Sequence, residues 1–366
     1  MVAKVFLSHQ ICSLSKIYEV TIITNISDQG SLLSWVPENV AIMDIPIQRE
    51  VHLYYDLKVL YLLIRFFYRS NFSLIHSVSP KAGLLAMLSS FFTKIPVRLH
   101  TFTGQVWATK HGLGRILLRW FDRVISLLAT IVLIDSHSQK QFLIKNKVVT
   151  ISNSIVLGEG SISGVDPRKF NINLDMREQI RSLKNISDNF IVYLFLGRIR
   201  KEKGIIELKQ AFCNIHNKNK NTSLWIVGPD EDLLSSELNN VDGIVVFPFT
   251  DSPEKYMNAA DIFCLPSYRE GFGSVIIEAG ACGIPSIGSN IYGLEDAIVN
   301  EKTGILVAKK SVIELETAME KLLNNSTLRK QMGVAAHDRA KSQFSTEFLT
   351  KELVGLYEKL LSTVRT

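Results

Sequence analysis

The sequence predicts an α/β protein with two doubly wound domains, each built on a parallel sheet, and three observations support this. Apolar runs of strand length alternate with helical segments along most of the 366 residues, which is typical of parallel strands joined by right-handed crossovers. A Gly- and Ser-rich segment, residues 157–166, divides the series into two halves. The strands at 190–196 and 262–265 each lead straight into a Gly-containing turn, as at the ligand-binding edge of such sheets.

The length is sufficient for two domains, each with its own hydrophobic core. We expect an N-terminal domain over residues 1–165 and a C-terminal domain over residues 166–345. Residues 346–366 form a terminal amphipathic helix in this prediction.

The N-terminal half opens unusually for a doubly wound domain. Such a domain normally begins with a strand and a Gly-containing turn, but the first glycine is Gly30, and residues 4–15 predict a helix or mixed segment before a strand at 19–24. We therefore expect this domain to lack its first strand. The later strands are predicted at 73–76, 97–101, 131–134 and 148–152, and the helices at 56–69, 80–92, 113–129 and 136–145.

The C-terminal half repeats the alternation. Its strands are predicted at 190–196, 223–227, 243–247, 262–265 and 303–307, with residues 289–294 as a loop, and its helices at 205–217, 274–282, 312–324, 328–343 and 346–361.

The stretch after the strand at 262–265 is the most informative part of the chain. Pro266 ends the strand, and Gly283 ends the short helix that begins at Ser274. The free amides of Gly273, Ser274 and Val275 would form an anion site suited to a phosphate, and Gly271 would let the backbone approach a ligand closely.

Two glutamates frame this loop. Glu270 precedes the glycines and Glu278 lies in the second helical turn, where a carboxylate can accept hydrogen bonds from neighbouring sugar hydroxyls. For either glutamate alone, a structural alternative is more common. Glu270 would then pair with Arg269 or cap the helix, and Glu278 would be an exposed helical residue.

A second anion site is predicted after the strand at 190–196. The segment GRIRKEKG places Arg198 and Lys203 in a turn that ends at Gly204, at the start of a helix. Cationic side chains beside free helix amides suit a phosphate. Two such turns can hold a diphosphate between them.

His100 stands at the end of the strand at 97–101, where a ligand-facing residue is expected in a parallel sheet. A lone histidine at a strand end is more often a hydrogen-bonded structural residue, and this alternative stays open. Asp230 and Asp232 form a D-x-D pair, the spacing of some metal sites. We favour Asp230 as a helix cap instead, and we expect neither a metal nor another cofactor.

These motifs together resemble the family 4 glycosyltransferases, whose signature is E-x7-E followed by a segment rich in alanine and glycine and by G-x-P. The matching residues are Glu270, Glu278, Ala279, Gly283 and Pro285, with the turn GRIRKEKG and the segment around His100 in support. The resemblance implies the GT-B fold, two Rossmann-like domains facing across a cleft, with the last helix packing back on the N-terminal domain.

The resemblance also implies roles for these residues. The C-terminal domain would bind a nucleotide sugar and the N-terminal domain the acceptor, with Glu270 and His100 as the catalytic residues. The implied donor-binding residues are Arg198, Lys203, Gly271, Phe272, Gly273, Ser274, Val275 and Glu278.

Composition and charge limit the other functions. Residues 1–180 hold 19 Lys and Arg against 12 Asp and Glu, a net charge of +7, whereas the remaining residues hold 22 against 23. No nucleic-acid-binding motif or dense basic run accompanies this charge, so we do not expect nucleic acid as a partner. The four cysteines lack zinc-site spacing, which favours a reduced cytoplasmic protein.

Residues 57–69 and 113–123 mix aromatic, aliphatic and basic side chains without reaching the length of a membrane span. We expect most of their apolar faces to be core, and the remaining aromatic and basic residues to hold the protein on an anionic inner-membrane surface.

The combined prediction is a retaining glycosyltransferase that moves a hexose or N-acetylhexosamine from a nucleotide sugar, a UDP-sugar in our interpretation. Its acceptor would be a polyprenyl-diphosphate-linked saccharide in bacterial surface polysaccharide synthesis (O-antigen or capsule). The alternatives are a UDP-sugar 2-epimerase of the same architecture and a catalytically impaired binding subunit. A nicotinamide dehydrogenase is disfavoured because no G-x-G-x-x-G follows a strand.

Overall fold

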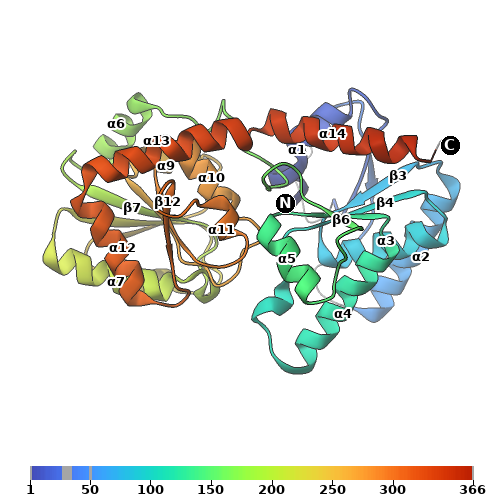
Figure 1. Cartoon of the computed structure of the whole chain (residues 1–366), viewed down its shortest axis with the longest axis horizontal. Helices are drawn as coiled ribbons and strands as arrows, with labels where there is room; N and C mark the ends of the chain where they lie inside the picture. The colour runs from blue at the N-terminus through green and yellow to red at the C-terminus, as the bar shows by residue number, and fades with distance from the viewer. Residues whose placement is uncertain (1, 27–34, 49–51, 365–366) are drawn as a thin grey trace. The chain divides into compact units, whose positions relative to one another are not determined.

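The computed structural model describes residues 2–26, 35–48 and 52–364. The chain divides into two compact units, and each is described separately (Figure 1). Unit 1 comprises Met1–Ser163 and Thr346–Thr366, and unit 2 comprises Gly164–Ser345. The terminal helix therefore belongs to the N-terminal unit, although the whole of unit 2 separates it in sequence from the rest of that unit.

Unit 1 contains two parallel sheets among its described residues. Strands β3 (Leu74–Ser77), β4 (Val97–Phe102), β5 (Ile131–Ile134) and β6 (Ser154–Ile155) form one sheet in the order β3-β4-β5-β6. The other is a parallel pair, β1 (Thr21–Thr24) and β2 (Ala41–Asp44). The helix α1 (Val2–Leu14) precedes β1, so the first described strand of the unit follows a helix.

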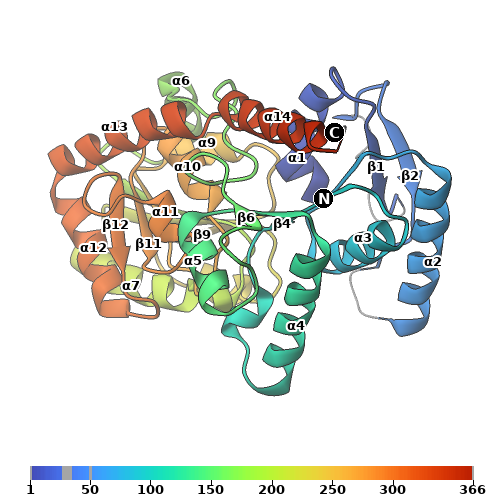
Figure 2. The same cartoon turned by 45° about the vertical axis from the view of Figure 1, so that its right-hand side comes forward.

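Helices cover the sheets of unit 1. They are α2 (Leu53–Arg69), α3 (Pro80–Phe92), α4 (Gly112–Leu128), α5 (His137–Lys145) and α14 (Thr346–Ser362), with a 3-10 turn at Val106–Thr109. Pro80 occupies the first turn of α3, where its missing N–H costs nothing, and α3 packs between α2 and α4 (Figure 2). The apolar face of α14, with Leu349, Leu353 and Leu356, packs against Leu99 and Leu133 of the sheet.

Unit 2 is a single six-stranded parallel sheet in the order β12-β11-β10-β7-β8-β9. The strands are β7 (Ile191–Leu196), β8 (Thr222–Val227), β9 (Ile244–Phe247), β10 (Ile262–Leu265), β11 (Ser286–Ser289) and β12 (Gly304–Val307). The helices are α6 (Leu174–Leu183), α7 (Ile205–Lys218), α8 (Ser235–Asn239), α9 (Pro253–Ala259), α10 (Ser274–Ala281), α11 (Leu294–Ala297), α12 (Val312–Asn324) and α13 (Ser326–Gln343).

The strand order of unit 2 determines where its ligand edge lies. From β7 the chain moves outward through β8 and β9, and it then returns to place β10 on the other side of β7. The sheet therefore has its topological switch point between β7 and β10. Loops that leave these two strands separate there and open a crevice outside the carboxyl ends of the strands.

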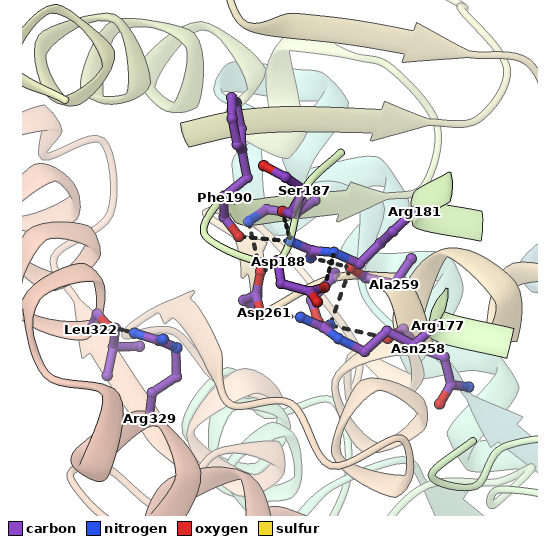
Figure 3. Close-up of polar contacts among 12 residues, drawn as sticks. Arg177, Arg181, Ser187, Asp188, Phe190, Asn258, Ala259, Asp261, Leu322 and Arg329 are labelled. Atoms are coloured by element: carbon purple, nitrogen blue, oxygen red, sulfur yellow. Dashed lines mark hydrogen bonds and ion pairs between the residues drawn. The ribbon is translucent and has the colours of Figure 1, made fainter. Parts of the chain in front are cut away.

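A buried ion-pair cluster fastens α6 to this sheet (Figure 3). Arg181, whose side chain is 2% exposed, donates to the carboxylate of Asp261 and to the carbonyls of Ala259, Ser187 and Phe190. Arg177 Nη2 donates to the other Asp261 oxygen at 2.7 Å, and Asp261 also accepts from the amide of Val192. A single carboxylate thus joins α6 to the starts of β7 and β10.

The predicted alternation of strands and helices is confirmed, with three differences among the strands and with three helices, α6, α9 and α11, that were not predicted. Residues 148–152, predicted as a strand, form a bend in which the Thr150 amide donates to Asn153 Oδ1, and pairing is limited to Ser154–Ile155. The other two are strands that were not predicted. β2 has an irregular pattern of exposure, and β11, of sequence SIGS, is buried through contacts with both neighbouring strands.

Candidate functional site

Two loops at the switch point of unit 2 carry most of the predicted site. One follows β7 and contains Arg198 and Lys203, and the other follows β10 and contains Glu270 and Gly273. The loops are held together by the backbone, because the amide of Tyr268 donates to the carbonyl of Glu202 at 2.9 Å. Gly204 is left-handed, with φ +74°, and a Cβ there would lie 2.1 Å from the carbonyl oxygen of Pro266. Only glycine allows this contact.

The helix α10 begins at Ser274, as predicted, after a left-handed Gly273 with φ +83° and ψ +54°. A Cβ on Gly273 would lie 2.4 Å from the Leu294 side chain. The first amides of the helix have no helical acceptor and point toward the switch point. The positive end of the helix dipole adds to their attraction for an anion.

Lys203 and Glu270 form an ion pair within this crevice. Lys203 Nζ donates to Glu270 Oε1 at 2.5 Å, and Ser267 Oγ donates to the same oxygen at 2.8 Å. The two charged side chains are 16% and 15% exposed, so both remain accessible at the loop edge. Glu270 pairs with Lys203 and not with Arg269, whose guanidinium instead lies 3.7 Å from Glu202.

Arg198 is more exposed than Lys203 and pairs with Glu231, with 3.2 Å between Nη1 and Oε2. Arg200 lies 3.5 Å from the same carboxylate and 3.3 Å from Glu202. Such exposed pairs contribute little stability, so Arg198 can exchange Glu231 for a more highly charged anion.

Glu278 lies in the second turn of α10 and is partly buried. Burial raises the pKa of its carboxyl to about 7; Lys169 opposes this rise and Glu254 adds to it. Lys169 Nζ donates to the carbonyl of Asp251 at 2.9 Å and lies 3.7 Å from Glu254. Sequence reasoning missed Lys169, because it lies about 100 residues before the motif in a segment without a pattern of its own.

Phe272 needs a correction as a donor-binding side chain. It is buried in the core of unit 2, and its ring lies 5.2 Å from that of Phe344. The buried Phe272 side chain anchors the loop to the core of unit 2. Only the backbone of this residue is therefore available to a ligand. The other predicted donor-binding residues, Gly271, Ser274 and Val275, lie in the loop and the first turn of α10.

His100 also needs a correction. It is fully buried in unit 1, its Nδ1 lies 2.8 Å from Ser77 Oγ, and its ring packs edge-on against Phe102. A Cβ on Gly83 would lie 2.4 Å from the His100 ring, so α3 closes over the imidazole. The structural alternative describes the Nδ1 side of the ring, while the buried Nε2 has no hydrogen-bond partner among the described residues. A catalytic role is not supported, because the ring does not reach the surface.

His76, on the neighbouring strand β3, affects His100 electrostatically and has polar partners of its own. His76 Nδ1 lies 2.6 Å from Tyr357 Oη of α14, and Nε2 lies 2.7 Å from Thr101 Oγ1. Burial lowers the pKa of His76 to about 3, and burial together with His76 lowers that of His100 to about 3. Both imidazoles are therefore neutral in the folded protein at neutral pH.

Unit 1 is expected to lose stability as the pH falls below about 6.5. The unfolded histidines take up protons near their ordinary pKa, whereas the folded ones do not until about pH 3, and each contributes about 1.4 kcal/mol per pH unit in this window. Burial raises the pKa of Asp122 to about 6, so between about pH 4 and 6 the folded protein binds this proton more tightly than the unfolded one. Over that range Asp122 stabilises the fold as the pH falls, which offsets the destabilisation caused by one histidine.

Urea unfolding at a series of pH values checks this prediction. The free energy of unfolding of His76→Gln should depend on pH less steeply than that of the wild type, by about one proton. That of Asp122→Asn should depend on pH more steeply. Equal slopes in all three proteins would contradict the buried, neutral histidines.

Sequence reasoning also missed Gln105, in the loop after β4. Gln139 Oε1 accepts from the Asp135 amide and its Nε2 donates to Gln105 Oε1, both at 3.0 Å. This chain fixes both amide orientations and leaves the buried Gln105 Nε2 without an acceptor among the described residues. A buried donor without a partner is costly, so an oxygen of a ligand or water is expected there. No feature of the sequence distinguishes this glutamine.

Asp230 lies near a helix start as predicted, but the helix α8 begins at Ser235, so Asp230 is not its N-cap residue. Its two carboxylate oxygens accept from the amides of Leu234 and Ser235, at 3.0 and 2.7 Å, at the start of α8. Asp232 accepts from the amide of Lys201 at 2.8 Å, which ties the segment before α8 to the basic turn. Both members of the D-x-D pair are thus engaged within the protein.

Comparisons with known proteins identify the family and the fold of the chain. The sequence model of the glycosyl transferases group 1 matches residues 176–339. The capsular polysaccharide biosynthesis glycosyltransferase CapM of Staphylococcus aureus is 31% identical over 342 residues, which cover 92% of this chain and 89% of that protein. The UDP-Gal:alpha-D-GlcNAc-diphosphoundecaprenol alpha-1,3-galactosyltransferase of Escherichia coli is 24% identical over 314 residues, 82% of this chain and 79% of that protein.

The chain therefore belongs to the group 1 glycosyltransferases and is a glycosyltransferase. Within that class it is of the family 4 type, with the GT-B fold. The Anabaena protein HepE, solved with UDP-glucose, aligns with a TM-score of 0.80 at 16% identity, over 98% of this chain and 96% of that one. Sucrose-phosphate synthase from Thermosynechococcus elongatus aligns with a TM-score of 0.79 at 20% identity, over 97% and 92%.

Proposed function

We propose that this glycosyltransferase transfers a hexose or N-acetylhexosamine, with retention of anomeric configuration, from a UDP-sugar bound at the switch point of unit 2. The observation that carries the proposal is the crevice between the loops after β7 and β10. There the ion-paired Lys203 and Glu270 lie in the loops that end at Gly204 and at the start of α10. Cationic and carboxylate groups side by side suit a sugar joined to a diphosphate.

Each group has a role in the proposed reaction. Lys203, Arg198 and the first amides of α10 stabilise the negative charge that develops on the departing diphosphate. The Lys203 ammonium has three N–H donors, so it can retain Glu270 while it donates to a phosphate oxygen. Glu270, held by Ser267 and Lys203, accepts hydrogen bonds from the sugar and keeps it in place during transfer.

Glu278 binds the nucleoside in this proposal. Its carboxylate has no hydrogen-bond partner in the part of the chain that the structure describes, and it lies near the cationic Lys169. In its ionised form, which the nearby Lys169 favours, the carboxylate accepts hydrogen bonds from the two ribose hydroxyls. The partial burial that raises its pKa strengthens these bonds, because fewer water molecules compete for the oxygens.

The variant Glu278→Ala is expected to weaken UDP binding about tenfold or more, since hydrogen bonds to a charged acceptor contribute about 1.5–3 kcal/mol. Titration calorimetry with UDP measures the effect. Glu358→Ala, which removes an exposed glutamate from α14 of unit 1, serves as the matched control and should bind UDP normally. Unchanged UDP affinity in a folded Glu278→Ala protein would contradict the assignment of the donor site to unit 2.

The acceptor in this proposal is a polyprenyl-diphosphate-linked saccharide, and the product enters bacterial surface polysaccharide. Two relatives support it, one named for capsular polysaccharide biosynthesis and one for transfer from UDP-Gal to a GlcNAc-diphosphoundecaprenol. The unpaired Gln105 Nε2, in the loop at the carboxyl end of β4, would donate to an acceptor oxygen. A lipid-linked acceptor places the enzyme at the anionic inner face of the membrane. No helix in the described ranges is long and apolar enough to cross a bilayer.

A further inference from the structure

We propose that Lys169 is a positioning residue of the donor site, which acts through Glu278. Its ammonium group lies beside the paired carboxyl groups of Glu254 and Glu278 and keeps Glu278 in the form that accepts the hydroxyls of a ribose. The inference rests on the proposed function, because it deepens the role given there to Glu278. It adds a cation from outside the motif and a second carboxylate, Glu254, that opposes it.

The helices α9 and α10 lie side by side (Figure 1 and Figure 2). Each follows a strand of the parallel sheet, so both begin at its carboxyl edge and run in the same direction. Asn258 Nδ2 of α9 lies 3.6 Å from the Sγ of Cys282, which directly follows α10. Glu254 and Glu278 lie four residues earlier on the same faces of the two helices. The two carboxyl groups are therefore neighbours, one turn closer to the ligand edge of unit 2.

Lys169 reaches this pair from the segment that precedes α6. Its Nζ donates to the carbonyl of Asp251 at 2.9 Å, in the loop that leads into α9, and lies 3.7 Å from Glu254 Oε2. That oxygen is buried and has no hydrogen-bond partner among the described residues. The ammonium is thus held by a carbonyl, and its charge acts on both carboxyl groups.

The environment of Glu278 contains opposing influences. Burial raises the pKa of its carboxyl, Lys169 lowers it, and Glu254 raises it further. The helices α11 and α13 also pack against α10. The other ionisable groups on or beside these elements are uncharged, bound to backbone carbonyls or exposed to solvent, and they are Cys282, His337, Arg339 and Glu295. We therefore assign the balance at Glu278 to Lys169 and Glu254.

The charge of Glu278 matters because both oxygens of an ionised carboxylate accept, whereas a protonated carboxyl uses one of them as a donor. The two ribose hydroxyls both donate in the proposed complex, so they require the ionised form. Burial disfavours this form and Lys169 favours it. UDP affinity is therefore complete above the pKa of Glu278, about 7, and is lost as the pH falls through that value.

Titration calorimetry with UDP between pH 5.5 and 8.5 tests the proposal. Wild-type affinity should fall below about pH 7, approaching about tenfold per pH unit. At pH 6.5, Lys169→Met should bind UDP about threefold or more weaker than the wild type, and Glu254→Gln about threefold tighter. Both differences should shrink toward pH 8.5, where Glu278 is ionised. Titration of the UDP phosphate itself is common to all the proteins and cancels in these ratios.

Lys169→Arg keeps the charge and should restore the wild-type profile. The matched control is Lys255→Met, which removes an exposed lysine from α9 and should also bind like the wild type. Circular dichroism at each pH shows that the variants are folded, and Glu254→Gln decides alone if Lys169→Met does not fold.

Two results would overturn the inference. One is the same pH profile in the wild type, Lys169→Met and Glu254→Gln. The other is a loss in Lys169→Met that is equal at every pH, because a purely structural role would give that result. Normal UDP affinity in Glu278→Ala would instead contradict the proposed donor site itself, so the two failures are distinguishable.

Discussion

Replacing Lys203 by Ala is expected to lower kcat about 10²-fold or more, the usual loss when one preorganised charge-stabilising group is removed from the transition state. Lys203 is only 16% exposed and lies against Glu270 at the switch point, so water replaces its charge poorly. The substitution also leaves Glu270 without its cationic partner, and the uncompensated carboxylate would then repel the diphosphate. Arg198→Ala is expected to act in the same direction.

Initial rates with a saturating UDP-sugar measure this effect. Lys209→Ala is the control, because Lys209 is a lysine of the following helix, α7, that pairs with the exposed Glu237. Its rate should be close to wild type. If Lys203→Ala/Arg198→Ala works at nearly the wild-type rate, the proposed diphosphate clamp is wrong.

Asp261→Ala is expected to destabilise unit 2 by about 3–5 kcal/mol, the range for removing one partner of a buried ion pair. The substitution leaves Arg181, 2% exposed, with a buried guanidinium and no carboxylate, and it also removes acceptors from Arg177 and from the Val192 amide (Figure 3). The loss would be measured as the change in free energy of unfolding in urea.

Asp188→Ala is the matched comparison. Asp188 also lies near Arg181, 3.9 Å from its Nε, but its carboxylate is fully exposed, so its removal should change stability little. Similar losses in the two variants would show that burial is not what makes Asp261 important.

The sequence was most informative where an element's bounds depend on residues within the element or next to it. The strand at 262–265, the helix starting at Ser274 and the turn that ends at Gly204 were predicted because apolar runs, Pro266 and the glycines each leave a local signal. The pairing of Lys203 with Glu270 had no such signal. It depends on β7 and β10 being neighbours, and strand order is a long-range property.

The errors at Phe272 and His100 share a physical cause. Both residues lie within motifs whose neighbours face the ligand edge, and residue type alone does not show that their side chains turn inward. Phe272 packs on Phe344, and His100 is covered by α3 at Gly83. The reverse error occurred at α4, where apolar residues predicted to be core lie exposed, because periodicity identifies an apolar face but not what covers it.

Transfer of label from radioactive UDP-sugars to a polyprenyl-diphosphate-saccharide extract tests the central claim most directly. The wild-type enzyme is predicted to move label into the organic phase from at least one UDP-sugar and to release UDP in equal amount, and Lys203→Ala should do so at least 10²-fold more slowly. An epimerised UDP-sugar without transfer, or UDP binding with no turnover across the whole panel of sugars, would contradict the account.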